Sequence, residues 1–136
     1  MLGATILIDA EIILDWLMDE ETYGKEAMRV LEECCSGNVN GYVAAHSITD
    51  TLYLANKHMS VRDINEIESN LFKIIKVVPI HEDNITRAMQ MEHFDNLEDA
   101  IQVQCAVDIN ADYILTKNVS NFSNSPIVAI SYEAFK

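Results

Sequence analysis

Residues that break regular structure or crosslink a chain are scarce in this sequence. Its 136 residues include four glycines, two prolines and three cysteines. Because so few glycines and prolines leave no recognisable linker, and because the length suits one domain, we expect a single domain over residues 1–136. Cys34 and Cys35 are adjacent, whereas Cys105 stands alone. An odd count without a C-x-x-C pair excludes a disulfide framework and a zinc knuckle, and predicts free thiols in a reducing compartment.

Long apolar runs and glycine-rich phosphate loops are also missing. The most apolar stretch, near the N-terminus, is interrupted by Asp9, Glu11 and Asp15, so it is too short to span a bilayer. It has neither a basic leader nor a small-residue cleavage site. We therefore expect a cytoplasmic protein without a membrane segment. Neither G-x-G-x-x-G nor G-x-x-x-x-G-K-S/T occurs, which argues against nucleotide binding through such a loop.

Basic residues are few. Nine lysines and arginines stand against 22 aspartates and glutamates, which gives a net charge of −13 and an isoelectric point near 4.4. A protein that coats nucleic acid by neutralising phosphates normally has a basic excess, so the composition argues against that class. It does not argue against an enzyme whose carboxylates hold divalent cations, because the metal then supplies the local positive charge.

Short apolar segments alternate with longer helical patterns along the chain. The segments that predict strands are 4–8, 41–45, 74–80, 113–116 and 126–130. The patterns that predict helices are 9–17, 22–36, a helix from Ser47 past Ala55, 61–72, 82–91 and 98–109, followed by a helical stub at 132–135. This alternation is typical of βαβ crossovers. We expect an α/β fold, a three-layer α/β/α sandwich with a central, mainly parallel five-stranded sheet.

Acidic and polar residues follow the predicted strands. They are Asp9 after the first strand, Asp50 soon after the second, Asp95, Glu98 and Asp99 before the fourth, and Thr116, Lys117 and Asn118 after the fourth. Ligands of parallel sheets bind beyond the carboxyl ends of the strands, so these residues are expected to share one edge. Clustered carboxylates repel one another, and a divalent cation such as Mg²⁺ or Mn²⁺ relieves that repulsion. Such a cation can activate water for attack on phosphorus.

Helix capping is the alternative explanation for these acids. Asp9 is placed to cap the first helix, and acidic residues at helix N-termini are favoured by the helix dipole. The segments 47–50 and 95–98 both resemble capping boxes, and Asn118 suits a turn. Taken singly, each position favours capping. The recurrence at successive strand ends favours a shared site.

Aromatic residues and histidines give weaker signals. Trp16, Tyr53, Phe72, Phe94 and Phe122 occupy helical or strand-flanking positions and are predicted to belong to the core. The four histidines share no metal-ligand spacing. Among them, His46 has the strongest claim to a functional role, because it lies beside the strand end that carries Asp50.

Four stretches resemble the PIN domains, a family of small α/β/α metal-dependent nucleases that includes the toxins of VapBC toxin–antitoxin pairs. They are ILIDAEIILDWL, YVAAHSITDTLYLANK, FDNLEDAIQVQCAVDINADYILTKN and VSNFSNSPIVAISYEAF, in the order that the family shows. The D-x-x-D-A-I-Q segment, followed by a strand and T-K-N-x-x-N-F, is the most specific. The resemblance implies an acidic cluster that binds Mg²⁺ or Mn²⁺ and hydrolyses single-stranded RNA.

The resemblance also assigns roles residue by residue. Asp9, Asp50 and Asp99 match the three acids that bind the metal and act in catalysis, with Asp50 where the family often has Glu. Asn118 matches a fourth catalytic position, where many members have Asp and the T-K-N branch has Asn. The accessory positions are Asp95 and Thr116.

Two departures from the family pattern concern the proposed site. Glu11 stands where the family usually has Asn, which adds a charge near the metal or points away from it. Asn118 removes an anionic ligand, so we expect one well-populated metal rather than two. Lys117 is the nearest basic residue and would contact the substrate phosphate, unless it is a solvated surface lysine.

The resemblance implies two protein partners, a second copy of the chain in a homodimer and an antitoxin that inserts a basic residue into the acidic site. A metal-dependent ribonuclease is the leading hypothesis for function. A second enzyme hypothesis is a nuclease that acts on DNA or on small structured substrates. A catalytically weak or silent PIN-like module for binding or scaffolding is the alternative from another class, favoured by Glu11, Asn118 and the acidic surface. The intact Asp9, Asp50 and Asp99 favour the enzyme.

Overall fold

A five-stranded sheet organises the fold in the computed structural model, which describes residues 1–18 and 20–135. The strands are β1 (Thr5–Ile8), β2 (Asn40–Ala44), β3 (Lys76–Val78), β4 (Tyr113–Leu115) and β5 (Val128–Ile130). Their order is β3-β2-β1-β4-β5, and every neighbouring pair is parallel. The predicted, mainly parallel five-stranded sheet is therefore confirmed, with β1 at its centre.

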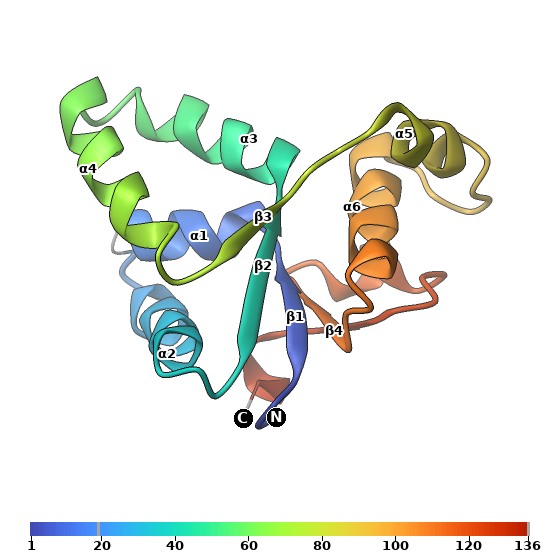
Figure 1. The fold of residues 1–136 in the computed structure, drawn as a ribbon, viewed down its shortest axis with the longest axis horizontal. Helices are drawn as coiled ribbons and strands as arrows, with labels where there is room; N and C mark the ends of the chain where they lie inside the picture. The colour runs from blue at the N-terminus through green and yellow to red at the C-terminus, as the bar shows by residue number, and fades with distance from the viewer. Residues whose placement is uncertain (19, 136) are drawn as a thin grey trace.

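Six α-helices cover the two faces of the sheet. They are α1 (Ala10–Leu17), α2 (Gly24–Cys35), α3 (Ala45–Ala55), α4 (Val61–Leu71), α5 (Glu82–Met89) and α6 (Leu97–Asp108). Figure 1 shows α1 to α4 on one side of the sheet and α5 with α6 on the other. Ile6 and Ile8 of β1 join the core under α1 to α4, whereas Leu7 joins the core under α6. The three-layer α/β/α arrangement is confirmed.

The predicted strand and helix boundaries lie within two residues of those observed, and two differences matter for the site. Helix α3 begins at Ala45 directly after β2, not at Ser47, and its N-cap Ala44 has no side chain that can accept a hydrogen bond. A short 3₁₀ helix, η1 (Val119–Phe122), was not predicted. The stub near the C-terminus is present as a second 3₁₀ helix, η2 (Tyr132–Ala134).

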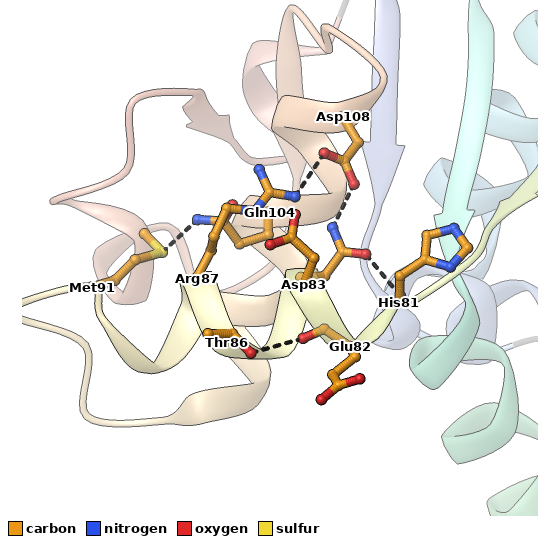
Figure 2. Close-up of polar contacts among 9 residues, drawn as sticks. His81, Glu82, Asp83, Thr86, Arg87, Met91, Gln104 and Asp108 are labelled. Carbon is orange, nitrogen blue, oxygen red and sulfur yellow. Dashed lines mark hydrogen bonds and ion pairs between the residues drawn. The ribbon is translucent and has the colours of Figure 1, made fainter.

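Polar contacts join α5 to the C-terminal end of α6 (Figure 2). The side chain of Asn84, which is buried, donates to Asp108 and accepts from the backbone N–H of His81 at 2.8 Å. Arg87 extends from α5 to Asp108 at 3.2 Å and to Asp83 at 3.1 Å. Together these contacts join α5 to the C-terminal end of α6, at the opposite end of that helix from Asp99.

The thiols and the membrane prediction can be compared with the structure. Cys34 and Cys105 are buried, Cys35 is exposed, and all three are free. Burial raises the pKa of the Cys34 thiol to about 12 and that of Cys105 to about 11, so both stay protonated. Within the residues described, no helix has the length and apolar character needed to cross a membrane.

Candidate functional site

A cleft of about 460 Å³ lies at the carboxyl edge of the sheet. The order of the strands reverses between β1 and β4, and such reversals are where open α/β sheets bind ligands. Fifteen residues line the cleft: Asp9, Ala10, Glu11, Leu14, His46, Ser47, Asp50, Tyr53, Leu54, Asn96, Glu98, Asp99, Gln102, Asn118 and Asn121. They come from α1, α3, α6 and the segment after β4. The structure therefore brings together Asp9, Asp50, Asp99 and Asn118, which the sequence predicted to share an edge.

Asp9 occupies the centre of this edge, immediately after β1. Its Oδ1 accepts from the backbone N–H of Ala10 at 2.8 Å, so Asp9 does cap α1 as the alternative explanation expected. Its Oδ2 accepts from Oγ1 of Thr116 at 2.8 Å. Thr116 is fully buried at the end of β4. A cap needs one carboxylate oxygen, and here the second oxygen is oriented by a residue 107 positions away.

Asn118 and Glu11 both line the cleft and are hydrogen-bonded to each other. The backbone N–H of Asn118 donates to Thr116 Oγ1 at 3.0 Å, and its side-chain Nδ2 donates to Glu11 Oε2 at 3.1 Å. Both side chains are on exposed residues that line the cleft. Glu11 therefore faces the site rather than pointing away, and the added charge is held by the residue that replaces the usual Asp.

Asp50 lies on the far side of the cleft, on α3. Because α3 begins at Ala45, Asp50 is in its second turn and does not cap it. Ser47 is buried and donates its Oγ to Gln102 Oε1 on α6 at 3.0 Å. The capping box predicted for 47–50 is therefore wrong. The Ser47–Gln102 bond ties α3 to α6 beneath the cleft and leaves the exposed Asp50 free to face it.

Asp99 lies opposite Asp9 and is affected by it. Partial burial, then the negative charges of Asp9 and Glu98, raise the pKa of the Asp99 carboxyl above its ordinary value, while His46 lowers it. The raised pKa shows that carboxylates from α1 and α6 are close enough to repel each other. Repulsion of this kind is what a divalent cation relieves.

Three predicted accessory residues are not among the residues that line the cleft: Thr116, which bonds the lining residues Asp9 and Asn118, and Asp95 and Lys117. Asp95 borders a neighbouring depression together with Asp99. It is not a helix cap, because Asn96 caps α6 by accepting from the N–H of Glu98 at 2.8 Å, so the capping box predicted for 95–98 is wrong. Lys117 points to the other side of its loop, where its Nζ lies 3.2 Å from Asp15. It is neither in the cleft nor a freely solvated lysine.

The donor set of the cleft suits a hard divalent cation. Asp9, Asp50 and Asp99 offer carboxylate oxygens, and Mg²⁺ needs only one or two carboxylates because it keeps several waters. No lysine or arginine is among the lining residues of the part of the chain that the structure describes. Within residues 1–18 and 20–135, no three His, Cys, Asp or Glu side chains stand grouped as a ready-made metal centre. The residues thus suit a cation that keeps several water ligands better than one that is bound entirely by protein ligands.

Several cleft residues were not predicted as site residues. Gln102 and Ser47 are 2% exposed, and Gln102 Nε2 is a buried nitrogen without a hydrogen-bond partner among the described residues. The signal was available in the spacing, because Gln102 follows Asp99 by three residues and Asp50 follows Ser47 by three, which places each pair on one helix face. Tyr53 was predicted as core but is 68% exposed at the rim of the cleft.

The charge on Asp99 predicts a stability effect. At neutral pH the Asp99→Asn variant should have a higher thermal midpoint than the wild type without metal, because asparagine removes a carboxylate that burial and Asp9 disfavour. As the pH falls through the raised pKa, the folded wild type takes up the proton before the unfolded chain does. The difference should therefore shrink towards about pH 4, near the ordinary value for Asp. Thermal unfolding in EDTA at both pH values measures it.

Glu66→Gln, an exposed change on α4, is the control for removing one negative charge from a protein at −13. A stabilisation equal in the two variants, or one independent of pH, would show that general charge reduction is the cause and not the cleft.

Comparison with known proteins places the chain in a family. A family model described as "PIN domain" matches residues 5–120, while no curated protein sequence matches the chain. The fold is similar to a toxin–antitoxin complex from Klebsiella pneumoniae, with a TM-score of 0.72 and 19% identity over 93% of this chain and 97% of that chain. It is similar to FitAcB from Neisseria gonorrhoeae, with a TM-score of 0.71 and 14% identity over 96% and 99%.

A third similar structure is Mycobacterium tuberculosis VapC20, described as a sarcin–ricin loop cleaving toxin, with a TM-score of 0.64 and 15% identity over 80% of this chain and 86% of that chain. At these identities the structural matches concern the fold. The family model covers β1 to the start of η1, the part of the chain that builds the cleft. The chain belongs to the PIN domain family.

Proposed function

We propose that this protein is a divalent-metal-dependent endoribonuclease that hydrolyses single-stranded RNA. The observation that carries the proposal is the cleft at the reversal of strand order, whose lining includes Asp9, Asp50 and Asp99 from three chain-distant elements. Two proteins of similar fold support the proposal: one is described as a sarcin–ricin loop cleaving toxin and another as a toxin–antitoxin complex. Membership of the PIN family supports a hydrolase.

Each of the cleft residues would have its own role in such a reaction. Asp9, Asp50 and Asp99 would hold the cation, which supplies a Lewis acid and lowers the pKa of water when it is bound. Thr116 orients Asp9 through the 2.8 Å bond to Oδ2. Asn118, held on Glu11, presents an amide that can orient a water or a phosphate oxygen by hydrogen bonding.

The test is cleavage of a mixed-sequence single-stranded RNA by the purified protein. We expect cleavage with Mn²⁺ and none with EDTA, and none from the Asp9→Asn variant with Mn²⁺. Single-stranded DNA of the same sequence, run in parallel, separates the ribonuclease from the DNA-directed alternative. If the folded wild type binds Mn²⁺ yet leaves a broad panel of RNA and DNA intact, the nuclease proposal fails.

The absence of basic residues from the described lining of the cleft predicts a weak salt dependence. Each phosphate neutralised by Lys or Arg on a single strand contributes a slope of roughly 0.7 in log affinity against log salt. Neutral amides such as that of Asn118 contribute no such slope. The KM for RNA at fixed Mn²⁺ should therefore change by less than about twofold between about 50 and 200 mM KCl, whereas three lysine contacts would change it by roughly twentyfold. A steep rise in KM would show that cations outside the cleft bind the RNA.

We further propose an antitoxin partner and a homodimer. Structures of similar fold include complexes described as VapBC2 from Rickettsia felis and FitAB, each bound to DNA. An acidic cleft without a lysine or arginine among its described lining residues is complementary to a basic side chain of such a partner. The second candidate function is a silent binding module. It is favoured by the Asn118–Glu11 bond and by the lack of a ready-made three-ligand centre in the described residues.

A further inference from the structure

The loop that follows β4 is fastened to α1 by three consecutive residues. Thr116 and Asn118 contact the N-cap and the first turn of α1, as described above. Lys117, between them, reaches the second half of the same helix, where its Nζ lies 3.2 Å from Oδ1 of Asp15. The side chains of Thr116 and Asn118 therefore contact residues that line the cleft, whereas the side chain of Lys117 points to the opposite side of the loop.

Asp15 is the buried end of this contact. It is 5% exposed, and its second oxygen, Oδ2, accepts from the hydroxyl of Tyr132 at 2.8 Å, so both oxygens are occupied. Burial, followed by the bond to Asp15, raises the pKa of Tyr132, which keeps the phenol protonated as the donor. The ammonium of Lys117 also lies 4.3 Å from the centre of the Tyr23 ring, which stacks on Tyr132 with ring centres 5.6 Å apart.

These contacts leave Lys117 little freedom. A buried carboxylate without a cation is strongly destabilising, so Asp15 needs the ammonium of Lys117 where it lies. Lys117 cannot neutralise Asp15 and sit beside a phosphate in the cleft at the same time. Only 27% of its side chain is exposed. The structure thus argues against the phosphate contact that the sequence suggested for Lys117.

We propose that Lys117 is a positioning residue whose ion pair with Asp15 holds the 116–118 loop against α1 and so keeps Thr116 Oγ1 on the Asp9 carboxylate. The effect on RNA cleavage rests on the nuclease activity proposed above, and the effect on Mn²⁺ affinity rests only on the metal site proposed there. Partners that orient a metal-binding carboxylate are typically worth roughly 10–100-fold in metal affinity or activity. Because Lys117 acts through Thr116, we expect the lower end of that range.

The experiment uses Lys117→Met, Asp15→Asn, the double variant and Lys117→Arg. Free Mn²⁺ is counted by electron paramagnetic resonance to give the Kd, kcat and KM are measured for RNA cleavage, and thermal midpoints are recorded. Arg87→Met is the matched control. It removes another cation that pairs with carboxylates, and neither Arg87 nor its partners Asp83 and Asp108 line the cleft.

Lys117→Met and Asp15→Asn should each raise the Kd for Mn²⁺ and lower kcat by about tenfold, with KM nearly unchanged. The double variant should be no worse than either single one, because both break the same link. Lys117→Arg should restore wild-type values, and Arg87→Met should change only the thermal midpoint. If Lys117→Met fails to fold, Asp15→Asn still answers the question, because Asn can accept from Tyr132 without leaving a buried charge unpaired.

Three results would overturn the proposal. A higher KM for Lys117→Met with normal kinetics for Asp15→Asn would show that Lys117 contacts the substrate. A lower thermal midpoint with unchanged Kd and kcat would show an ion pair that stabilises the fold alone. Additive losses in the double variant would show that the two residues act separately. If the wild type cleaves no RNA, the proposed function fails, and the Mn²⁺ affinities still decide this inference.

Discussion

Asp9→Asn is expected to remove metal-dependent activity while leaving the fold intact. A cation in such a site stabilises the transition state by several kcal/mol, so loss of a central carboxylate should lower kcat/KM by roughly two or more powers of ten. The fold tolerates asparagine because its Oδ1 can accept from Ala10 N–H as Asp9 does. Its Nδ2 would then face the Thr116 hydroxyl, which can accept a hydrogen bond as well as donate one.

The thermal midpoint of Asp9→Asn without metal should equal or slightly exceed that of the wild type, because asparagine caps a helix about as well as aspartate and no longer repels Asp99. Asp9→Ala is the matched comparison. It should be equally inactive but less stable by about 1 kcal/mol, the usual cost of losing a cap. RNA cleavage and thermal unfolding of both variants measure this. If the Asp9→Asn variant keeps its activity, Asp9 is a helix cap and not a metal ligand.

Gly41→Ala should cause a large loss of stability. Gly41 lies in β2, and a Cβ added there would come within 2.6 Å of Cys34 Sγ and 2.9 Å of Ile75 Cγ2. Both neighbours are buried and close-packed, so the strand or the side chains must shift. Overpacking of this kind costs about 1–3 kcal/mol. Thermal or urea unfolding measures the loss, with Asn40→Ala, an exposed change in the same strand, as the control.

A double-mutant cycle identifies the clash. Cys34→Ala leaves a small cavity and destabilises the protein by itself, but it removes the Sγ atom that an alanine at position 41 would meet. The double variant should therefore be more stable than the sum of the two single losses predicts, by about 0.5 kcal/mol or more. Strict additivity would locate the problem at Ile75 or in the strand backbone.

The fold could be predicted from the sequence because its central strands, β1 and β4, are short, apolar and mostly buried. Segments such as Thr5–Ile8 read as continuous apolar runs between helical patterns, which is typical of a parallel sheet covered on two sides. Strand order was not predictable in the same way. That β1 lies at the centre, between β2 and β4, depends on how the helices pack, and no single segment records it.

The start of α3 shows why helix boundaries were harder to predict than the fold. Capping rules look for Ser, Thr, Asp or Asn, and Ser47 was the first such residue after β2. The chain instead turns directly from Ala44 into the helix without a side-chain cap. Ser47 is thereby freed to bond Gln102 of α6, and both side chains are buried.

The strand-end argument located the cleft but not every member of it. Asp9, Asp50, Asp99 and Asn118 line it because each follows or begins an element at the carboxyl edge of the sheet. Lys117 is adjacent to Asn118 in sequence yet faces the other way, and only the position of Asp15 reveals its partner. The roles of all these residues stay predictions until the variants are measured.

The separation of Asp9 from Thr116 has a consequence for the order of events during synthesis. Strand β1 is among the first segments made, yet its partner β4 lies more than 100 residues later. Contacts of such long sequence separation form late, because the intervening chain must be ordered first. Until β4 has left the ribosome, β1 lacks one of its two neighbours and Asp9 lacks its hydroxyl. A growing chain therefore carries no finished cleft, so any activity of the cleft begins only after β4 has paired with β1.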